Sequence, residues 1–151
     1  MKTTTFADLA DRLDTGMARF KNEQPMTLLE AGTVIQTSAM EMLGTYQGAK
    51  PPFEAWAPLN EQTQEQRVRA GYSADEPLFR TGELRESIEV RVAENTVHVG
   101  VAGDMATIAA AQEYGTARIP PRPFLRPAAK EALPEVGRIV TGALRRAILE
   151  D

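Results

Sequence analysis

The stretch IEVRVAENTVHVGV, residues 88–101, decides the fold class, because apolar and polar residues alternate along both of its halves. Alternation with a period of two is typical of strands that bury one face, so the stretch predicts an antiparallel hairpin that turns at Glu94 and Asn95. The apolar residues then pair on one face: Ile88 with Val101, Val90 with Val99 and Val92 with Val97. Glutamate is a poor first residue for a two-residue turn, and a longer turn with a shifted register stays open.

Two helices are expected before the hairpin. Thr5 and Asp8 form an N-terminal capping pattern, and apolar residues then recur at helical spacing, which predicts a first helix over residues 6–19. Thr27 with Glu30 repeats the capping pattern ahead of a second apolar stripe. This second helix is expected to end where glycine and proline become frequent.

Two more helices are expected after the hairpin. The alanine-rich residues 106–112 predict a short one that ends near Gly115. The C-terminal one has an apolar residue at every third or fourth position: Leu133, Val136, Val140, Leu144 and Ile148. Pro134 removes a backbone donor from this helix, and we expect a kink or a restart there.

The order of these elements predicts an α+β domain over residues 1–151. Its small antiparallel sheet is built on the hairpin and is covered by two N-terminal helices and a long C-terminal helix. Residues 44–80 form a long excursion, because glycine and proline are too frequent there for one regular element, although residues 60–69 fit a short polar helix. Connections of this length are uncommon unless they are functional, which makes the excursion a candidate arm or binding loop.

Composition excludes several kinds of chemistry. The chain has 21 acidic and 17 basic residues, so no global charge draws it to nucleic acid or to an anionic membrane. It has no cysteine and His98 is its one histidine, which excludes disulfides and multi-histidine metal sites. We expect no cofactor, no export signal and no membrane span. A hydrolase that uses His98 as its base is the weakest alternative, since no phosphate-binding, nucleophile-elbow or zinc-protease motif occurs.

The segment QEYGTARIPPRPFLRPA, residues 112–128, is the most distinctive part of the chain. Gly115 permits a backbone turn that other residues resist, and the prolines at positions 120, 121 and 123 hold the following chain extended and stiff. Pro127 is pre-set to begin the last helix. Phe124 and Leu125 are then anchors, either in the chain's own core or against another subunit.

Other motifs accompany this segment in a specific order, namely WAPL at residues 56–59, LFRTGELRESI at residues 78–88 and the valine hairpin. From Trp56 onward the chain resembles the small neck and tail-completion proteins of long-tailed bacteriophages, the virion morphogenesis family. It departs from that family at residues 109–111, where alanines replace an aromatic-plus-alanine element.

The resemblance implies a non-enzymatic structural virion protein that is made in the host bacterial cytoplasm. Such a protein joins the tail or neck to the DNA-filled head as a homo-oligomeric ring. Its neighbours would be neck, connector or tail-tube proteins, and DNA would pass through the lumen without sequence-specific binding.

The candidate assembly interface combines residues from these motifs: Trp56, Arg80, Thr81, Glu113, Tyr114, Arg118, Arg122, Phe124 and Arg126. We favour pairing of the three motif arginines with acids of a neighbouring copy, with DNA phosphates or a plain solvated surface as the alternatives. A second hypothesis is a DNA-binding accessory protein with a local basic face made of Arg118, Arg122, Arg126, Arg138, Arg145 and Arg146.

Overall fold

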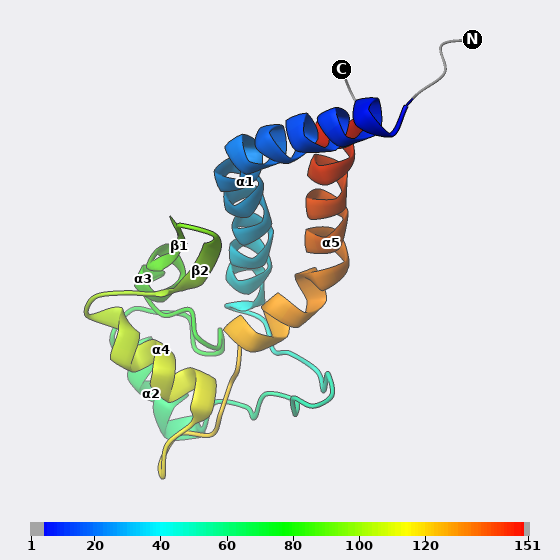
Figure 1. Ribbon diagram of the computed structural model, residues 1–151. Helices are drawn as coiled ribbons and strands as arrows, with labels where there is room; N and C mark the ends of the chain where they lie inside the picture. The colour runs from blue at the N-terminus through cyan, green and yellow to red at the C-terminus, as the bar shows by residue number, and fades with distance from the viewer. Residues whose placement is uncertain (1–4, 150–151) are drawn as a thin grey trace.

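A computed structural model of the chain describes residues 5–149 and shows an α+β fold, as predicted (Figure 1). The elements follow one another as α1 (Phe6–Met42), α2 (Glu61–Arg69), α3 (Glu83–Glu86), β1 (Ile88–Ala93), β2 (Thr96–Val101), α4 (Met105–Tyr114) and α5 (Leu125–Leu149). The two strands form an antiparallel sheet. The two long helices α1 and α5 lie alongside each other, and the shorter elements gather near the C-terminal end of α1 (Figure 1).

The hairpin has the predicted register, with Ile88 opposite Val101, Val90 opposite Val99 and Val92 opposite Val97. Glu94 and Asn95 are the turn residues, so the shifted register is excluded. Glu94 adopts a φ of 50°, in the left-handed region that side chains other than glycine rarely occupy. The pairing of the flanking valines therefore outweighs the poor fit of glutamate to the turn.

The expectation of two N-terminal helices is wrong, because the single helix α1 covers both. Thr5 and Asp8 cap its start as predicted, since each backbone N–H donates to the other residue's side chain at 2.8 and 3.1 Å. Thr27 caps nothing: its hydroxyl donates to the carbonyl of Glu23 within the helix. Pro25 bends α1 instead of ending it (Figure 1).

Helix α1 makes most of the helix contacts to the hairpin, and α3 and α4 also contact β1 and β2, whereas α5 was expected to share that role. Figure 1 places the hairpin and α5 on different sides of α1. The hairpin approaches α1 at Gly32, where an added Cβ would lie 2.5 Å from Val90 and 2.6 Å from Val97. The absence of a side chain at Gly32 therefore permits this contact.

Helix α5 packs along α1 through small residues. Ala143 and Ala147 are buried, and an added Cβ at Gly16 would lie 3.0 Å from the backbone of Ala147 and Ile148. Pro134 was expected to kink or restart the helix. Helix α5 runs through it and changes direction in that region (Figure 1).

A compact core lies where α3, the base of the hairpin, α4 and the start of α5 meet the end of α1. Its buried members are Ala39, Met42, Leu43, Trp56, Leu84, Ile88, Ala109, Phe124 and Ala128. The excursion that was a candidate arm closes on itself beside this core. The Gly44 N–H donates to the Pro77 carbonyl at 2.8 Å and joins the two ends of the excursion.

Polar contacts order the interior of the excursion. Asn60 caps α2, which confirms the predicted short helix. The Tyr46 hydroxyl donates to Asp75 and accepts from the Leu59 N–H. Burial raises the pKa of Tyr46, and its hydrogen bond to Asp75 acts in the same direction. The excursion is thus a folded part of the subunit, not a free arm.

Gly32 and Gly137 allow a matched test of the contact between α1 and the hairpin. Alanine favours a helix by about 1 kcal/mol over glycine, so Gly137→Ala, which meets no atom within 4 Å, should stabilise the protein. Gly32→Ala should instead lower the free energy of unfolding by about 1–2 kcal/mol, because the hairpin must move away. Urea denaturation of both variants checks this, and a stabilised Gly32→Ala would contradict the close packing.

Candidate functional site

Residues 112–128 first fold back on themselves. Helix α4 ends at Tyr114, near the predicted position, and Gly115 follows with a φ of 75°. An added Cβ there would lie 3.0 Å from the Ile119 carbonyl, so this position requires glycine. The Thr116 N–H donates to that carbonyl at 2.8 Å, and the Arg122 N–H then donates to the Gln112 carbonyl at 2.6 Å. The segment is therefore a closed turn followed by a short extended stretch.

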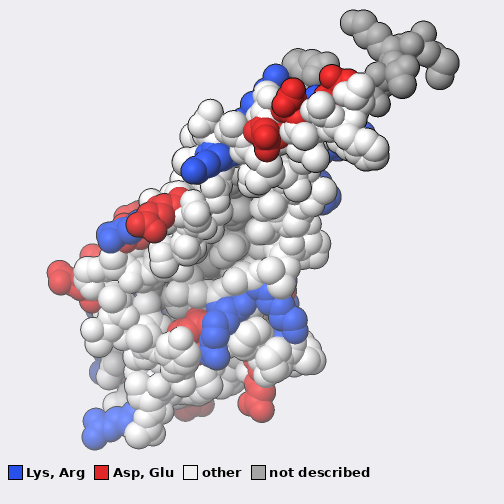
Figure 2. Space-filling view, in the orientation of Figure 1, with Lys and Arg blue, Asp and Glu red and all other residues white. Residues whose placement is uncertain are grey.

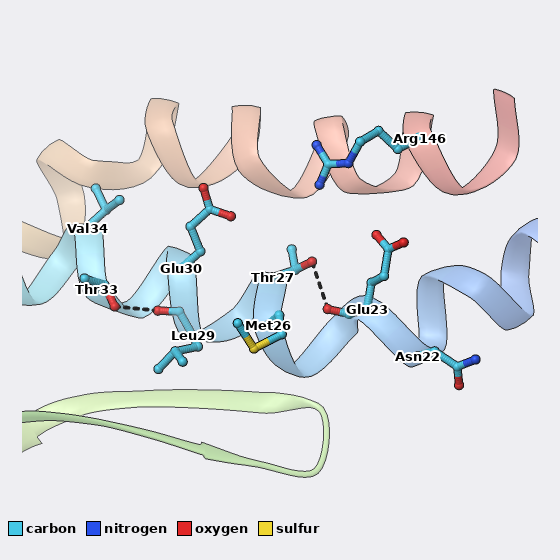
Figure 3. A pocket seen from close by; sticks show the side chains of 9 residues that line it. All are labelled: Asn22, Glu23, Met26, Thr27, Leu29, Glu30, Thr33, Val34 and Arg146. Carbon is cyan, nitrogen blue, oxygen red and sulfur yellow. Dashed lines mark hydrogen bonds between the residues drawn. The ribbon is translucent and has the colours of Figure 1, made fainter. Parts of the chain in front are cut away.

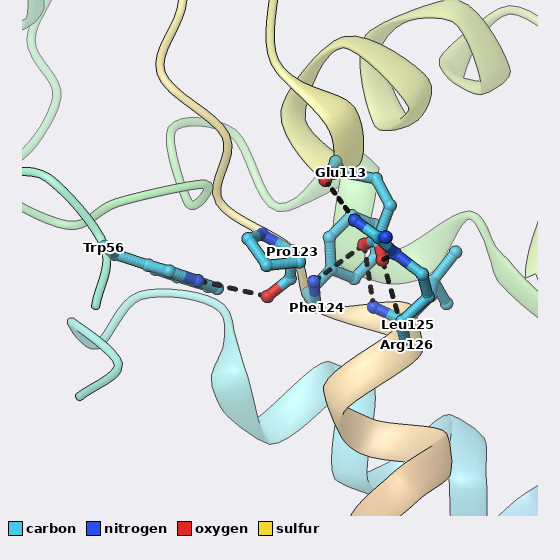
Figure 4. A network of polar contacts seen from close by, with 6 residues as sticks. All are labelled: Trp56, Glu113, Pro123, Phe124, Leu125 and Arg126. Carbon is cyan, nitrogen blue, oxygen red and sulfur yellow. Dashed lines mark hydrogen bonds and ion pairs between the residues drawn. The ribbon is translucent and has the colours of Figure 1, made fainter. Parts of the chain in front are cut away.

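The Glu113 carboxylate caps the start of α5, although Glu113 itself lies in α4 (Figure 4). One carboxylate oxygen accepts from the N–H groups of Phe124 at 2.7 Å and Leu125 at 3.0 Å, and the other accepts from that of Arg126 at 3.1 Å. These N–H groups have no partner within the helix, and the helix dipole favours a negative charge there. This explains how Glu113 can be 3% exposed.

Helix α5 begins slightly earlier than predicted. Its first residue is Leu125, and Pro127 lies in its first turn. The missing N–H of proline costs little in that turn, because such groups have no carbonyl partner within the helix. The Glu113 cap therefore sets the helix start, and Pro127 is compatible with it.

Arg126 completes the cap from the helix side. Its Nε donates to the Glu113 carboxylate at 2.9 Å and its Nη2 to the Glu113 carbonyl at 3.0 Å. The guanidinium also lies 4.7 Å from the ring centre of Tyr114 and 5.3 Å from that of Phe53. The acid that pairs with Arg126 is therefore in the same chain, and not in a neighbouring copy as we expected.

Arg122 and Trp56 link the WAPL motif to the junction between α4 and α5, residues 112–128, which we call the joint. Arg122 is 5% exposed, and its Nε and Nη2 donate to the Ala57 carbonyl at 3.0 and 2.8 Å. The Trp56 indole N–H donates to the Pro123 carbonyl at 3.0 Å (Figure 4). Burial lowers the pKa of Arg122. The WAPL motif and the 112–128 segment are thus bonded to each other in the folded chain.

The nine candidate interface residues divide into a buried and an exposed group. Trp56, Glu113, Arg122 and Phe124 are buried and hold the joint together from inside, so in the free subunit they have partners within their own chain. The exposed group is Arg80, Thr81, Tyr114, Arg118 and Arg126. A contact with another molecule remains a prediction for these five.

Thr81 lies just ahead of the one-turn helix α3. Its hydroxyl accepts from the Glu83 N–H at 3.4 Å, while Gly82 occupies the cap position with a φ of 89°. The neighbouring Arg80 lies over the Tyr72 ring, 5.5 Å from its centre. Thr81 therefore contributes to the start of α3 from the residue that precedes the cap position.

The six arginines of the DNA-binding hypothesis do not form one face. Arg122 is buried, Arg126 pairs with Glu113, and Arg138 pairs with Glu135. Arg145 and Arg146 lie near the far end of α5. On the face shown in Figure 2, charged side chains occur in small separate groups and uncharged residues cover most of the surface. The six arginines therefore do not combine into one continuous basic patch of the kind that duplex DNA contacts.

His98 lies exposed on β2, opposite Arg91 of β1. Within residues 5–149, no group of three or more histidine, aspartate or glutamate side chains is placed to hold a metal ion. No helix in this described part is long and apolar enough to cross a membrane.

Sequence reasoning missed the buried Arg67 of the excursion. Its Nη1 donates to the Glu76 carbonyl at 2.6 Å, and it is 9% exposed although every residue of α2 except the exposed Val68 is polar. No apolar stripe marks an inward face on this helix, so no local pattern indicates the burial. Burial lowers the pKa of Arg67, and the nearby Arg80 lowers it further.

No family model matches the chain, and no curated protein or solved structure shows significant similarity to it. The resemblance to phage neck and tail-completion proteins therefore stays a prediction.

The carboxylate of Glu113 can be tested against a surface carboxylate of similar type. Glu113→Ala leaves buried N–H groups without an acceptor and should lower the free energy of unfolding by about 3 kcal/mol. Glu113→Gln retains an oxygen acceptor and should lower the free energy of unfolding by about half as much. Glu135→Ala breaks a surface pair and should change it by less than about 0.5 kcal/mol. Equal losses for Glu113→Ala and Glu135→Ala in urea denaturation would contradict the cap.

Phe124 is a residue of the chain's own core and not an exposed anchor, because its side chain is fully buried in the core cluster. Phe124→Ala should therefore lower the free energy of unfolding by about 3–5 kcal/mol. Tyr114→Ala, at a largely exposed ring, should cost less than about 1 kcal/mol. Thermal and urea unfolding of the two variants checks this. A similar small loss in the free energy of unfolding for both would contradict the core position of the Phe124 ring.

Proposed function

We propose that this chain is a structural virion assembly protein, a neck or tail-completion subunit that joins a phage tail to the DNA-filled head as a homo-oligomeric ring. The proposal assigns it no catalytic activity, and places it in the virion after manufacture in the host bacterial cytoplasm. The observation that carries it is a large apolar surface on the two long helices, which the subunit itself leaves uncovered.

The accessible surface of the subunit is 10199 Å². A compact monomer of this mass is expected to expose only about 7,500 Å². The excess, about 2,700 Å², is larger than two patches of about 800 Å² each, the size that a standard interface buries on each partner. A ring subunit needs two such patches, because each copy contacts one neighbour on either side.

The first half of α1 exposes an apolar stripe of helical spacing. Phe6, Leu9, Leu13 and Met17 are 93, 47, 43 and 54% exposed. This spacing is typical of a helix face that packs against a partner, and within the subunit that face is not packed. We propose that a second copy covers this stripe.

Helix α5 supplies a second exposed set, formed by Leu133, Val140 and Leu144. Near the middle of α1, Met26 and Leu29 help to line a groove of about 640 Å³ that also includes Arg146 of α5. The side chains of Met26 and Leu29 point toward the hairpin (Figure 3). Glu23 and Glu30 point to the other side, toward α5 and Arg146 (Figure 3). Stripes that differ in shape and charge suit a head-to-tail contact, in which one patch of each copy meets the other patch of the next.

The acidic charge of the chain agrees with a conduit. A ring of such subunits would carry excess negative charge, which repels DNA phosphates and lets DNA pass without binding tightly. The scattered arginines support this more than they support a clamp. The resemblance of residues 56–128 to neck and tail-completion proteins supports the same assignment.

Association of the purified protein tests the proposal. Native mass spectrometry or negative-stain images should show rings or ring-sized oligomers, at least at high concentration. Changing Leu9 and Met17 together to glutamate should raise the midpoint concentration of association at least about tenfold, because it places charge in the apolar stripe. Val68→Glu, at a comparably exposed site on α2, is the matched control and should leave the midpoint unchanged.

A strictly monomeric protein that also fails to bind tails or connectors would overturn the proposal. Equal effects of the double variant and of Val68→Glu would show that net charge, and not the stripe, governs association.

A further inference from the structure

A cavity of about 460 Å³ lies where the excursion meets the turn of residues 112–122. Its volume is within the range of about 300–1,000 Å³ that is typical of ligand pockets. Three arginines line it, Arg67, Arg118 and Arg122, together with apolar side chains such as Leu59 and Ile119. No carboxylate occurs among its described lining residues, although the chain as a whole has more acids than bases.

The two buried arginines of this cavity, Arg67 and Arg122, form no direct ion pair within residues 5–149, although Glu76 and Asp75 act on Arg67 electrostatically. Arg122 bonds to the Ala57 and Pro58 carbonyls and Arg67 to the Glu76 carbonyl, which leaves part of each five-donor guanidinium unused. Buried charges are normally paired, so this arrangement is suited to an incoming anion.

Gln112 supplies a second, independent observation. Its side-chain oxygen is buried and has no hydrogen-bond partner. The residue lines both this cavity and an adjoining one of about 270 Å³, which it shares with Arg67 and Leu78. A buried acceptor without a partner costs free energy, and an occupant that brings an N–H or O–H group would remove this cost.

These features together define the occupant. The arginines select a carboxylate, the Gln112 oxygen selects a hydrogen-bond donor, and the apolar walls select methylene groups. A peptide segment with an acidic side chain carries all three, through its carboxylate, backbone N–H and side-chain stem. A DNA phosphodiester offers no donor.

We propose that the cavity lined by Arg67, Arg118, Arg122 and Gln112 binds an acidic peptide segment of a partner protein. The site does not depend on ring formation, and it stands if the subunit proves to be monomeric. Burial of Arg67 and Arg122 lowers the pKa of both groups, and a bound carboxylate would offset that effect.

Nuclear magnetic resonance of the ¹⁵N-labelled full chain tests the site at constant ionic strength. The probes are a capped Gly-Glu-Leu peptide and its Gly-Gln-Leu counterpart. The acidic peptide should shift the side-chain N–H signals of Arg67, Arg122 and Gln112 saturably, with a midpoint at least about tenfold below that of the neutral peptide.

Two variants assign the effect to the cavity. Arg118 is exposed, so Arg118→Gln should fold normally and raise the midpoint for the acidic peptide about tenfold. Arg138→Gln removes an equal charge from α5, outside the cavity, and should leave the midpoint unchanged.

Three results would overturn the proposal. They are equal midpoints for the two peptides, the absence of saturable shifts with either, and binding of inorganic phosphate or a short DNA duplex as tight as that of the acidic peptide. The first two would remove the acidic peptide as a ligand, and the third would make the cavity a general anion site.

Discussion

The carboxylate of Glu113 is the constraint on which the rest of the structure depends. It accepts three backbone N–H groups at the start of α5 and an ion-paired guanidinium, while its own residue belongs to α4. One buried charge therefore fixes the angle at which α5 leaves the core. Because α5 then runs beside α1, this angle also affects how the two long helices pack. The hydrogen bonds offset the cost of burying the carboxylate, and the low exposure strengthens each of them.

The placement of small and large side chains gives the two ends of the subunit different properties. Between α1 and α5 the chain buries Gly16, Ala143 and Ala147, which allow close backbone approach but contribute little apolar area. The larger apolar residues of the same helices, such as Leu13 and Leu144, point outward. A subunit built to be stable alone would place them the other way round. The core around Phe124 and Trp56 therefore supports the fold, and the two long helices leave larger apolar side chains exposed.

Features set by neighbouring residues could be predicted from the sequence, and features set by distant contacts could not. The hairpin register follows from a period of two, and the Thr5 cap from a three-residue spacing. Thr27 shows the same pattern yet lies inside a helix, because the packing of α1 against the hairpin and α5 favours its continuation through Pro25. Glu113 lies in α4 and bonds to the start of α5. The motif marked this residue as a candidate, but no local pattern indicates which backbone groups it contacts.

The three arginines of the 112–128 segment show how far spacing can mislead. Positions 118, 122 and 126 are four residues apart, which on one helix would place them on one face. Here they lie in a turn, an extended stretch and a helix start, so their side chains diverge. Arg126 is neutralised by Glu113 and Arg122 is held by carbonyl groups, which orient it without cancelling its charge. Arg118 stays exposed, while Arg122 lies inward and lines one cavity together with Arg67 of the excursion. Arg67 and Arg122 are 55 positions apart in the sequence, so the two guanidiniums lie close together only in the folded protein.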